Sequence, residues 1–130
     1  MSGTDKYEAG FRKLEEIVGT TTAEAALKAF DDLDPDIGRY LAESIYGDLY
    51  QRQGVDLKTR QLCTVAALTC MASFKPHLKT HIAGALNVGA TQAEVIEVIL
   101  QMAAYAGFPA ATTGLAAARE VFEKRGDKSA

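Results

Sequence analysis

The chain has 130 residues, a formal net charge of −3 and 48% hydrophobic residues. These values are typical of a globular protein with a single domain over residues 1–130 and a sizeable buried core. The acidic balance and the lack of a basic cluster argue against nucleic acid as a partner. No apolar run has membrane-spanning length and no signal region starts the chain, so we expect a cytoplasmic protein with no membrane contact.

Three helices are expected in the first part of the chain. Residues 4–18 show helical periodicity that ends at Gly19, and Thr22 can cap a short helix over residues 23–32. Asp34-Pro35 starts a third helix, with proline at the first helical position. The positions expected to form the apolar faces of these helices are Tyr7, Phe11, Leu14, Val18, Ala26, Leu27, Phe30, Ile37, Leu41, Ile45 and Leu49.

Two helices in tandem, over residues 56–72 and 76–88, form the centre of the predicted fold. Asp56 suits the N-cap of the first helix, because its carboxylate can accept from free N–H groups of the first turn. Pro76 suits the first position of the second helix, and Gly89 is a usual C-cap residue. The first helix is apolar on nearly all sides, which predicts that protein surrounds it.

Both cysteines lie in that apolar helix. Cys63 and Cys70 are seven residues apart, which corresponds to about 10 Å of helix rise. A disulfide requires Cα atoms within roughly 7 Å, so the two thiols are expected to stay reduced. We interpret both as small, inert core residues.

The last part of the chain predicts two further helices. Thr91 and Glu94 have capping-box spacing and precede a helix over residues 92–106, and a last helix covers residues 109–124. Because no alternating strand pattern of useful length occurs, we predict an all-α fold with antiparallel neighbours. The apolar residues of 92–106 cover more surface than one core contact needs, which predicts an obligate homo-oligomer with this helix at a subunit contact.

His77 and His81 are the candidate chemical groups, since residues four apart share a helix face. Gly84 and Ala85 follow on that face and leave room for a ligand or for the backbone of another helix. A histidine can exchange a proton near neutral pH, which suits a general acid or base. The alternative is a structural histidine satisfied in a helix contact. The pair also has metal-ligand spacing, but a third ligand would have to be a carboxylate such as Asp48, and we expect no metal.

Arg60 is the strongest candidate for binding a carboxylate, because a guanidinium at the edge of an apolar helix can donate two parallel hydrogen bonds. The alternative is a structural ion pair with Asp48 or Glu43. Arg39 and Arg52 are weaker candidates of the same kind. Asp48 follows a glycine inside a helical pattern, which suggests close packing that turns this carboxylate inward; a solvated carboxylate is the alternative.

The chain resembles the carboxymuconolactone decarboxylase family, which includes the alkylhydroperoxidase-like proteins. The resemblance implies an all-α, alkylhydroperoxidase-like bundle of about six helices that assembles as a trimer or hexamer. It covers nearly the whole chain and is carried by motifs in the order and approximate spacing of the family: Tyr7-x-x-Gly10, Tyr46-Gly47-Asp48, Thr59-Arg60, His81, Gly89-Ala90-Thr91, Glu94, Glu97, Tyr105-Ala106-Gly107-Phe108-Pro109-Ala110 and Glu120-Val121-Phe122.

The local motif separates the two branches of that family. The peroxidase branch carries Cys-x-x-Cys-x-x-x-His, and aligning its histidine with His81 puts Phe74 and His77 at its cysteine positions. The chain is therefore more similar to the decarboxylase branch, which implies loss of carbon dioxide from a small carboxylated lactone such as 4-carboxymuconolactone, without cofactor. The family usually has Trp-Gly-Glu at Tyr46-Gly47-Asp48 and an acidic residue at His77, so the substrate itself stays open.

The leading hypothesis assigns roles to seven residues. His81 is the general acid, Asp48 orients it or the substrate, and His77 is a second proton relay. Carboxylate and ring binding fall to Arg60, Arg39, Arg52 and Tyr46. Two alternatives remain open: a thiol-dependent peroxidase using Cys63 or Cys70, and a non-catalytic family member that binds a small molecule.

Overall fold

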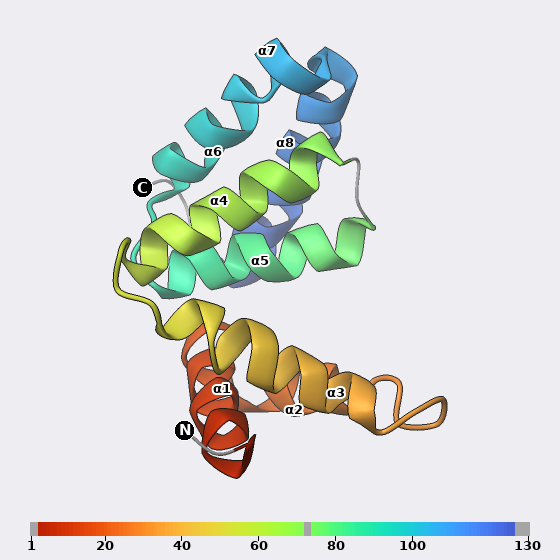
Figure 1. Cartoon of the computed structure of the whole chain (residues 1–130). Coiled ribbons are helices and arrows are strands. Elements are labelled where there is room, and N and C mark those ends of the chain that lie inside the picture. Colours follow the sequence, from red (N-terminus) through yellow and green to blue (C-terminus); the bar gives the residue numbers. More distant parts are fainter. Residues whose placement is uncertain (1–2, 72–73, 127–130) are drawn as a thin grey trace. The chain divides into compact units, whose positions relative to one another are not determined.

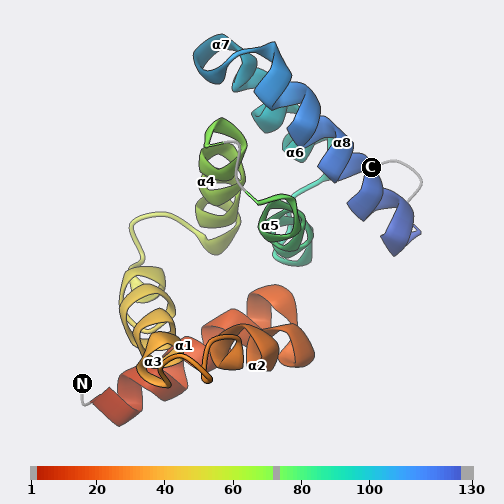
Figure 2. The same ribbon diagram turned by 90° about the vertical axis from the view of Figure 1, so that its right-hand side faces the viewer.

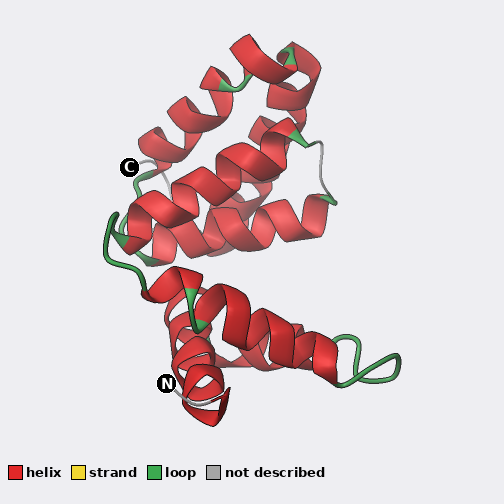
Figure 3. Cartoon of the chain, in the orientation of Figure 1, coloured by secondary structure: helices red, strands yellow, loops and turns green. Residues whose placement is uncertain are grey.

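The computed structural model describes residues 3–71 and 74–126, and within these ranges the chain is helical with no strand (Figures 1 and 3). The elements in chain order are α1 (Gly3–Val18), α2 (Thr20–Lys28), α3 (Asp36–Tyr40), the π-helix η1 (Leu41–Tyr46), the 3₁₀ turn η2 (Leu49–Gln51), α4 (Leu57–Cys70), α5 (Lys75–Asn87), α6 (Gln92–Gln101), α7 (Ala103–Ala106) and α8 (Phe108–Arg125). The all-α prediction is confirmed. The chain separates between Asp56 and Leu57 into two compact units, and the expectation of a single domain stays a prediction.

In the N-terminal unit, α1 packs against η1 through glycines. A Cβ atom on Gly10 would overlap the carbonyl group of Ala42, and one on Gly47 would overlap the carbonyl oxygen of Lys6. The two backbones can approach this closely only because both residues lack a side chain. The expectation that Gly47 marks close packing is therefore confirmed.

The prediction of one continuous third helix is wrong, because this segment is not a single α-helix. It begins as α3, continues as the π-helix η1 and stops before Gly47. Its buried residues also differ from the expected stripe: Ile37, Ile45 and Leu49 are exposed and Leu41 is half-buried, whereas Gly38, Ala42, Tyr46 and Tyr50 are buried. Gly38 and Ala42 occupy positions on this face where neighbouring backbones come close; a Cβ atom on Gly38 would overlap the carbonyl oxygen of Leu27.

The second predicted helix is displaced toward the N-terminus. Gly19 has a φ of 89° and forms the break after α1, so α2 starts at Thr20 and Thr22 is not its cap. The helix ends at Lys28, and Phe30 lies in the following turn with 51% of its surface exposed. Phe30 is therefore not a core residue of this unit.

The C-terminal unit has its core where α4, α5, α6 and α8 meet. Figure 2, turned by 90° from Figure 1, keeps α4 beside α5 and α6 beside α8. Gly114 of α8 lets α4 and α6 come close, since a Cβ atom there would lie 2.8 Å from Ile99 Cγ2 and 3.1 Å from Thr69 Cγ2. The buried core comprises Val65, Leu78, Ile82, Ala85, Ala90, Val95, Ile99, Ala117, Ala118 and Val121.

Most predicted helix ends in this unit are confirmed. Pro76 lies in the first turn of α5, and Gly89 follows that helix with a φ of 110°. Thr91 and Glu94 form the expected capping box on α6. The predicted helix over 92–106 is interrupted, however. The N–H of Met102 donates to the carbonyl oxygen of Ile99 at 3.1 Å, and this hydrogen bond between residues three apart tightens the backbone between α6 and α7.

The interpretation of both cysteines as core residues is wrong. Cys63 and Cys70 are exposed on α4. The buried face of α4 is instead formed by Gln61, Val65 and Thr69, which recur every four residues. An almost uniformly apolar sequence does not reveal which face of the helix is buried. Composition alone would predict apolar residues at the buried positions, but two of them are the polar residues Gln61 and Thr69.

None of the helices within residues 3–71 and 74–126 combines the length and the hydropathy that crossing a bilayer requires.

Candidate functional site

His81 lies where α4 and α5 pack together in the C-terminal unit. The residue is partly buried on α5, between the buried residues Leu78 and Ile82 of the same helix. Its Nδ1 atom is 3.1 Å from Oε1 of Gln61, which comes from α4. The imidazole is therefore fixed by a side chain twenty positions earlier in the chain.

The surroundings of His81 disfavour its charged form. Partial burial removes water that would solvate an imidazolium, and the neighbouring His77 adds a like charge when both are protonated; together they lower the pKa of His81 below its ordinary value. The free protein therefore holds His81 neutral at pH 7. A neutral imidazole is ready to accept a proton, and it becomes a donor only once another charge stabilises the imidazolium.

The free energy of unfolding is expected to depend on pH through His81. The unfolded chain binds a proton at this histidine at higher pH than the folded chain does, so stability should fall as pH decreases from about 6.5 through the folded pKa. Above that window this contribution should be constant. Urea unfolding between about pH 7.5 and 5 measures it, and a His81→Gln variant should lose that part of the slope. An unchanged slope would contradict the lowered pKa.

His77 lies one turn before His81, as predicted, but it is exposed. Its ring meets the ring of Phe74 edge-on, with centroids 5.3 Å apart. Two neighbouring lysines, Lys75 and Lys79, are bound to Glu120 of α8 at 2.9 and 3.6 Å. These ion pairs tie the start of α5 to α8.

Arg60 belongs to the first turn of α4, one residue before Gln61. The residue is partly exposed while its Nε atom is buried, so the guanidinium lies at the margin of the packed interior, as the sequence predicted. Its backbone carbonyl accepts from Thr64 at 3.1 Å. Such a position suits a cation that binds an anion arriving from solvent.

Tyr46 and Asp48 belong to the N-terminal unit. Tyr46 is buried, its ring centroid is 4.8 Å from that of Tyr50, and burial together with Tyr50 raises the pKa of its phenol above the ordinary value. Asp48 is exposed, and Lys6 lies 3.7 Å from its carboxylate. The glycine before Asp48 creates the expected close packing, but the carboxylate itself does not turn into the interior of this unit.

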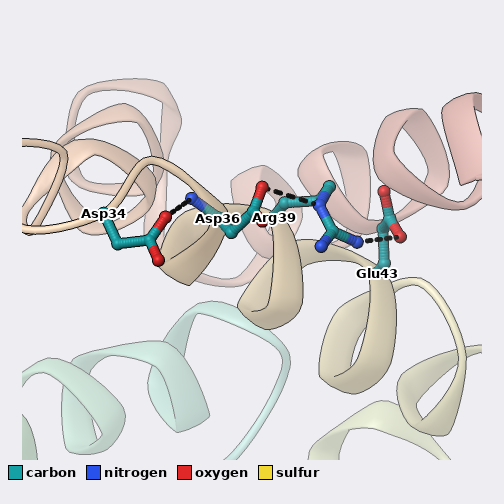
Figure 4. Close-up of polar contacts among 4 residues, drawn as sticks. All are labelled: Asp34, Asp36, Arg39 and Glu43. Atoms are coloured by element: carbon teal, nitrogen blue, oxygen red, sulfur yellow. Dashed lines mark hydrogen bonds and ion pairs between the residues drawn. The ribbon is translucent and has the colours of Figure 1, made fainter.

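Arg39 is held by carboxylates of its own unit (Figure 4). Its Nε donates to Asp36 at 3.2 Å and its Nη1 to Glu43 at 3.3 Å, and the guanidinium lies over the ring of Tyr40 at 4.8 Å. The Asp36 carboxylate raises the pKa of Arg39, and Arg39 lowers that of Asp36. Arg39 therefore has a structural role in this unit. Arg52 follows η2 in an extended conformation and is exposed.

A groove of about 360 Å³ lies elsewhere on the C-terminal unit, between α6 and α8, and includes none of the predicted site residues. It is lined by Gln92, Ile96, Leu115, Ala118, Arg119, Phe122 and Glu123. Across the two described ranges, no three His, Cys, Asp or Glu side chains are grouped in a way that would hold a metal ion.

Gln61 is the functional candidate that sequence reasoning missed. It is a single polar residue at the start of an apolar run, and its link to His81 arises only when α4 packs on α5. One signal was present: Gln61 shares a four-residue spacing with Val65 and Thr69, so it lies on the buried face of α4. A glutamine on a buried face needs hydrogen-bond partners, which favours a tertiary contact.

The helical fold of the described residues agrees with the family that the sequence resembles. Residues 35–120 match the model of the carboxymuconolactone decarboxylase family, and the chain belongs to this family. A 4-carboxymuconolactone decarboxylase of Acinetobacter baylyi is 29% identical over 97% of this chain and 93% of its own length.

Two further relatives extend the comparison. An uncharacterized 15.0 kDa protein of Paracoccus denitrificans, from the nqo9-nqo10 intergenic region, is 33% identical over 78% of this chain and 77% of its own. The nitrosuccinic acid decarboxylase npaB of Metarhizium robertsii is 25% identical over 94% of this chain and 85% of its own. Two of the three relatives are therefore named for loss of a carboxyl group.

Proposed function

We propose that this protein is a cofactor-independent decarboxylase of small polycarboxylates, among them carboxylated lactones such as 4-carboxymuconolactone. The observation that carries the proposal is His81, a partly buried imidazole fixed by Gln61, in a chain whose relatives include two decarboxylases.

The two named substrates share one chemical property. Loss of carbon dioxide leaves an electron pair on carbon, and a lactone carbonyl or a nitro group in the substrate can accept it. Such a molecule carries its own electron acceptor, so the protein needs only to bind the carboxylates and return a proton to carbon. This is why no cofactor is required by the proposed reaction.

His81 supplies that proton. The carbon–carboxylate bond breaks, carbon dioxide leaves, and the electron pair moves into the acceptor group of the substrate. A proton then passes from the His81 imidazolium to the substrate carbon, and His81 returns to its neutral form. Because the free protein holds His81 neutral, the proton is taken up when a negatively charged substrate binds and stabilises the imidazolium.

The other candidate residues bind the substrate or transfer protons to and from His81. Arg60 fixes a substrate carboxylate through its planar guanidinium, and His77, which is exposed on the same helix, carries protons between solvent and His81. Tyr46 and Asp48 keep the roles that the family resemblance implies, substrate contact and orientation. Arg52 is a secondary carboxylate ligand, and Arg39 ranks last because Asp36 and Glu43 already bind its guanidinium.

Turnover of defined substrates tests the proposal. Purified protein should consume 4-carboxymuconolactone or nitrosuccinic acid with release of carbon dioxide, and the ultraviolet absorbance of the lactone should decline. A His81→Gln variant serves as the control for background decarboxylation. If the wild-type protein releases no carbon dioxide from either compound above that control, the substrate class is wrong.

The thiol-peroxidase alternative receives one supporting observation, the exposure of both cysteines. Exposed thiols should react within minutes with a thiol reagent, in contrast to the slow labelling that buried ones would show. The proposed function predicts rapid labelling of Cys63 and Cys70 but no consumption of peroxide, since a disulfide-cycling peroxidase needs a partner thiol within reach. Peroxide consumption that disappears in the Cys63→Ser or Cys70→Ser variant would favour the peroxidase. A non-catalytic small-molecule binder would show neither activity.

Assembly into a homo-oligomer, a trimer or a hexamer, is part of the proposal. Ile96 and Leu100 of α6 are 38% and 40% exposed, and Ile96 also lines the groove beside α8. Apolar side chains gathered in this way favour a subunit contact. Light scattering at micromolar concentration should give a mass of three or six chains, and Ile96→Asp should shift it toward the monomer. A folded wild-type monomer near 13.9 kDa would contradict this assembly.

A further inference from the structure

Gln61 is a buried polar residue that contacts the side chain of His81. It has no exposed surface, although most of α4 around it is apolar. A buried amide destabilises the fold unless it is hydrogen-bonded. Thr69, on the same buried face, satisfies its hydroxyl within its own helix by donating to Val65 at 2.8 Å. Gln61 instead reaches α5, where its Oε1 lies 3.1 Å from Nδ1 of His81.

The chemistry of this contact determines which nitrogen of His81 carries the proton. An amide oxygen has only lone pairs and cannot donate, so Nδ1 must carry the hydrogen. A neutral imidazole has a single N–H group, which leaves a lone pair on Nε2. We infer that Gln61 is a positioning residue that holds His81 as the Nδ1–H tautomer and so makes Nε2 the atom that exchanges the proton with substrate. The part of this inference that concerns substrate rests on the proposed function.

A glutamine at position 61 differs from a glutamate in its effect on the pKa of His81. A glutamate would accept the same hydrogen bond but would stabilise the imidazolium and raise the pKa of His81. Glutamine fixes the ring without adding charge. Of the charged groups on α4, α5 and α8, His77 acts on the pKa of His81. Arg60 is next to Gln61 in the sequence, and Glu120 of α8 binds Lys75 and Lys79 of α5. The amide thus leaves control of the protonation state to the bound substrate.

Nitrogen NMR of the wild-type protein tests the tautomer without any substrate. Long-range proton–nitrogen spectra of protein labelled with nitrogen-15 in histidine distinguish a protonated ring nitrogen from one with a lone pair. Only two histidines are present, and a His77→Gln variant assigns them. Above its pKa, His81 should show a protonated Nδ1 and an unprotonated Nε2. A protonated Nε2, or the tautomer mixture of free histidine, would overturn the inference.

Two substitutions test the role of Gln61 itself. Gln61→Met keeps the length and removes the acceptor, so the tautomer preference should be lost and kcat should fall about tenfold, the equivalent of one hydrogen bond. Gln61→Glu should keep the Nδ1–H tautomer and raise the pKa of His81 by about one unit or more. Thr69→Val is the control: it removes a buried hydroxyl from the same face, so the tautomer and pKa of His81 should stay as in the wild type.

The outcomes separate this inference from the proposed function. If Gln61→Met retains the wild-type tautomer and kcat, Gln61 does not position His81, and decarboxylation by the wild type is unaffected by that result. If no substrate is turned over but the spectra show the Nδ1–H tautomer lost in Gln61→Met, the positioning role holds while the function fails. If Gln61→Met does not fold, the wild-type spectra still decide the tautomer.

Discussion

Replacing His81 with glutamine is expected to lower turnover about 10²- to 10⁴-fold, the usual contribution of a positioned general acid. Glutamine has a similar length, and its amide can still donate to Gln61, so α5 should keep its packing and the helical circular-dichroism signal should be unchanged. The matched control is His77→Gln on the same helix face. It should retain most activity, because an exposed relay can be replaced by water. Equal losses in the two variants would contradict the assignment of His81 as the proton donor.

The pH dependence of the wild-type enzyme gives an independent check on the same residue. The rate constant kcat/KM reports ionisations of the free enzyme, in which the pKa of His81 is lowered. It should therefore decline with rising pH, starting below the pKa of an ordinary histidine. The kcat profile reports the enzyme–substrate complex, where bound carboxylates stabilise the imidazolium. It should stay level to higher pH, and the histidine-dependent decline should be absent in His81→Gln.

Helix positions in the C-terminal unit were predictable because local signals mark them. Pro76, Gly89 and the Thr91–Glu94 capping box determine where a helix starts or stops within a few residues of their own positions. In the structure, α5 starts at Lys75 and ends at Asn87, and α6 starts at Gln92. The orientation of α4 was not predictable in the same way. Its sequence is apolar on nearly every side, so only contacts with α5, α6 and α8 determine that Cys63 and Cys70 face outward.

The same difference between local signals and tertiary contacts applies to the candidate site. His81 could be chosen as a candidate from the sequence because histidine is rare in this chain and chemically distinctive. Gln61 was missed because its role depends on a contact across twenty residues of sequence. The π-helix over 41–46 was missed for a related reason: hydrophobic spacing predicts a helix but does not reveal an extra residue within a turn. The π-helix ends at Tyr46, a proposed substrate-contacting residue. Hydrophobic spacing therefore predicted the backbone before this residue less well than the helices of the C-terminal unit.

Gly10→Ala is expected to destabilise the N-terminal unit, although alanine normally favours a helix interior by about 1 kcal/mol. The new methyl group would overlap the backbone of Ala42, and a backbone carbonyl cannot rotate away as a flexible side chain can. Overpacking typically costs about 1–3 kcal/mol, and a clash with backbone belongs at the upper end. We expect a net loss of about 2 kcal/mol in the free energy of unfolding, measured by urea titration.

A glycine without near neighbours supplies the control for this substitution. Apart from its chain neighbours, a Cβ atom on Gly54 would have no atom within 4 Å, so Gly54→Ala should leave the free energy of unfolding within about 0.5 kcal/mol of the wild type. Near-ultraviolet circular dichroism of Tyr46 and Tyr50 should weaken in Gly10→Ala, because their ring contact belongs to the segment that α1 supports. A more stable Gly10→Ala protein would mean that helix propensity outweighs the clash. In that case the close approach of α1 to η1 would not require a glycine at position 10.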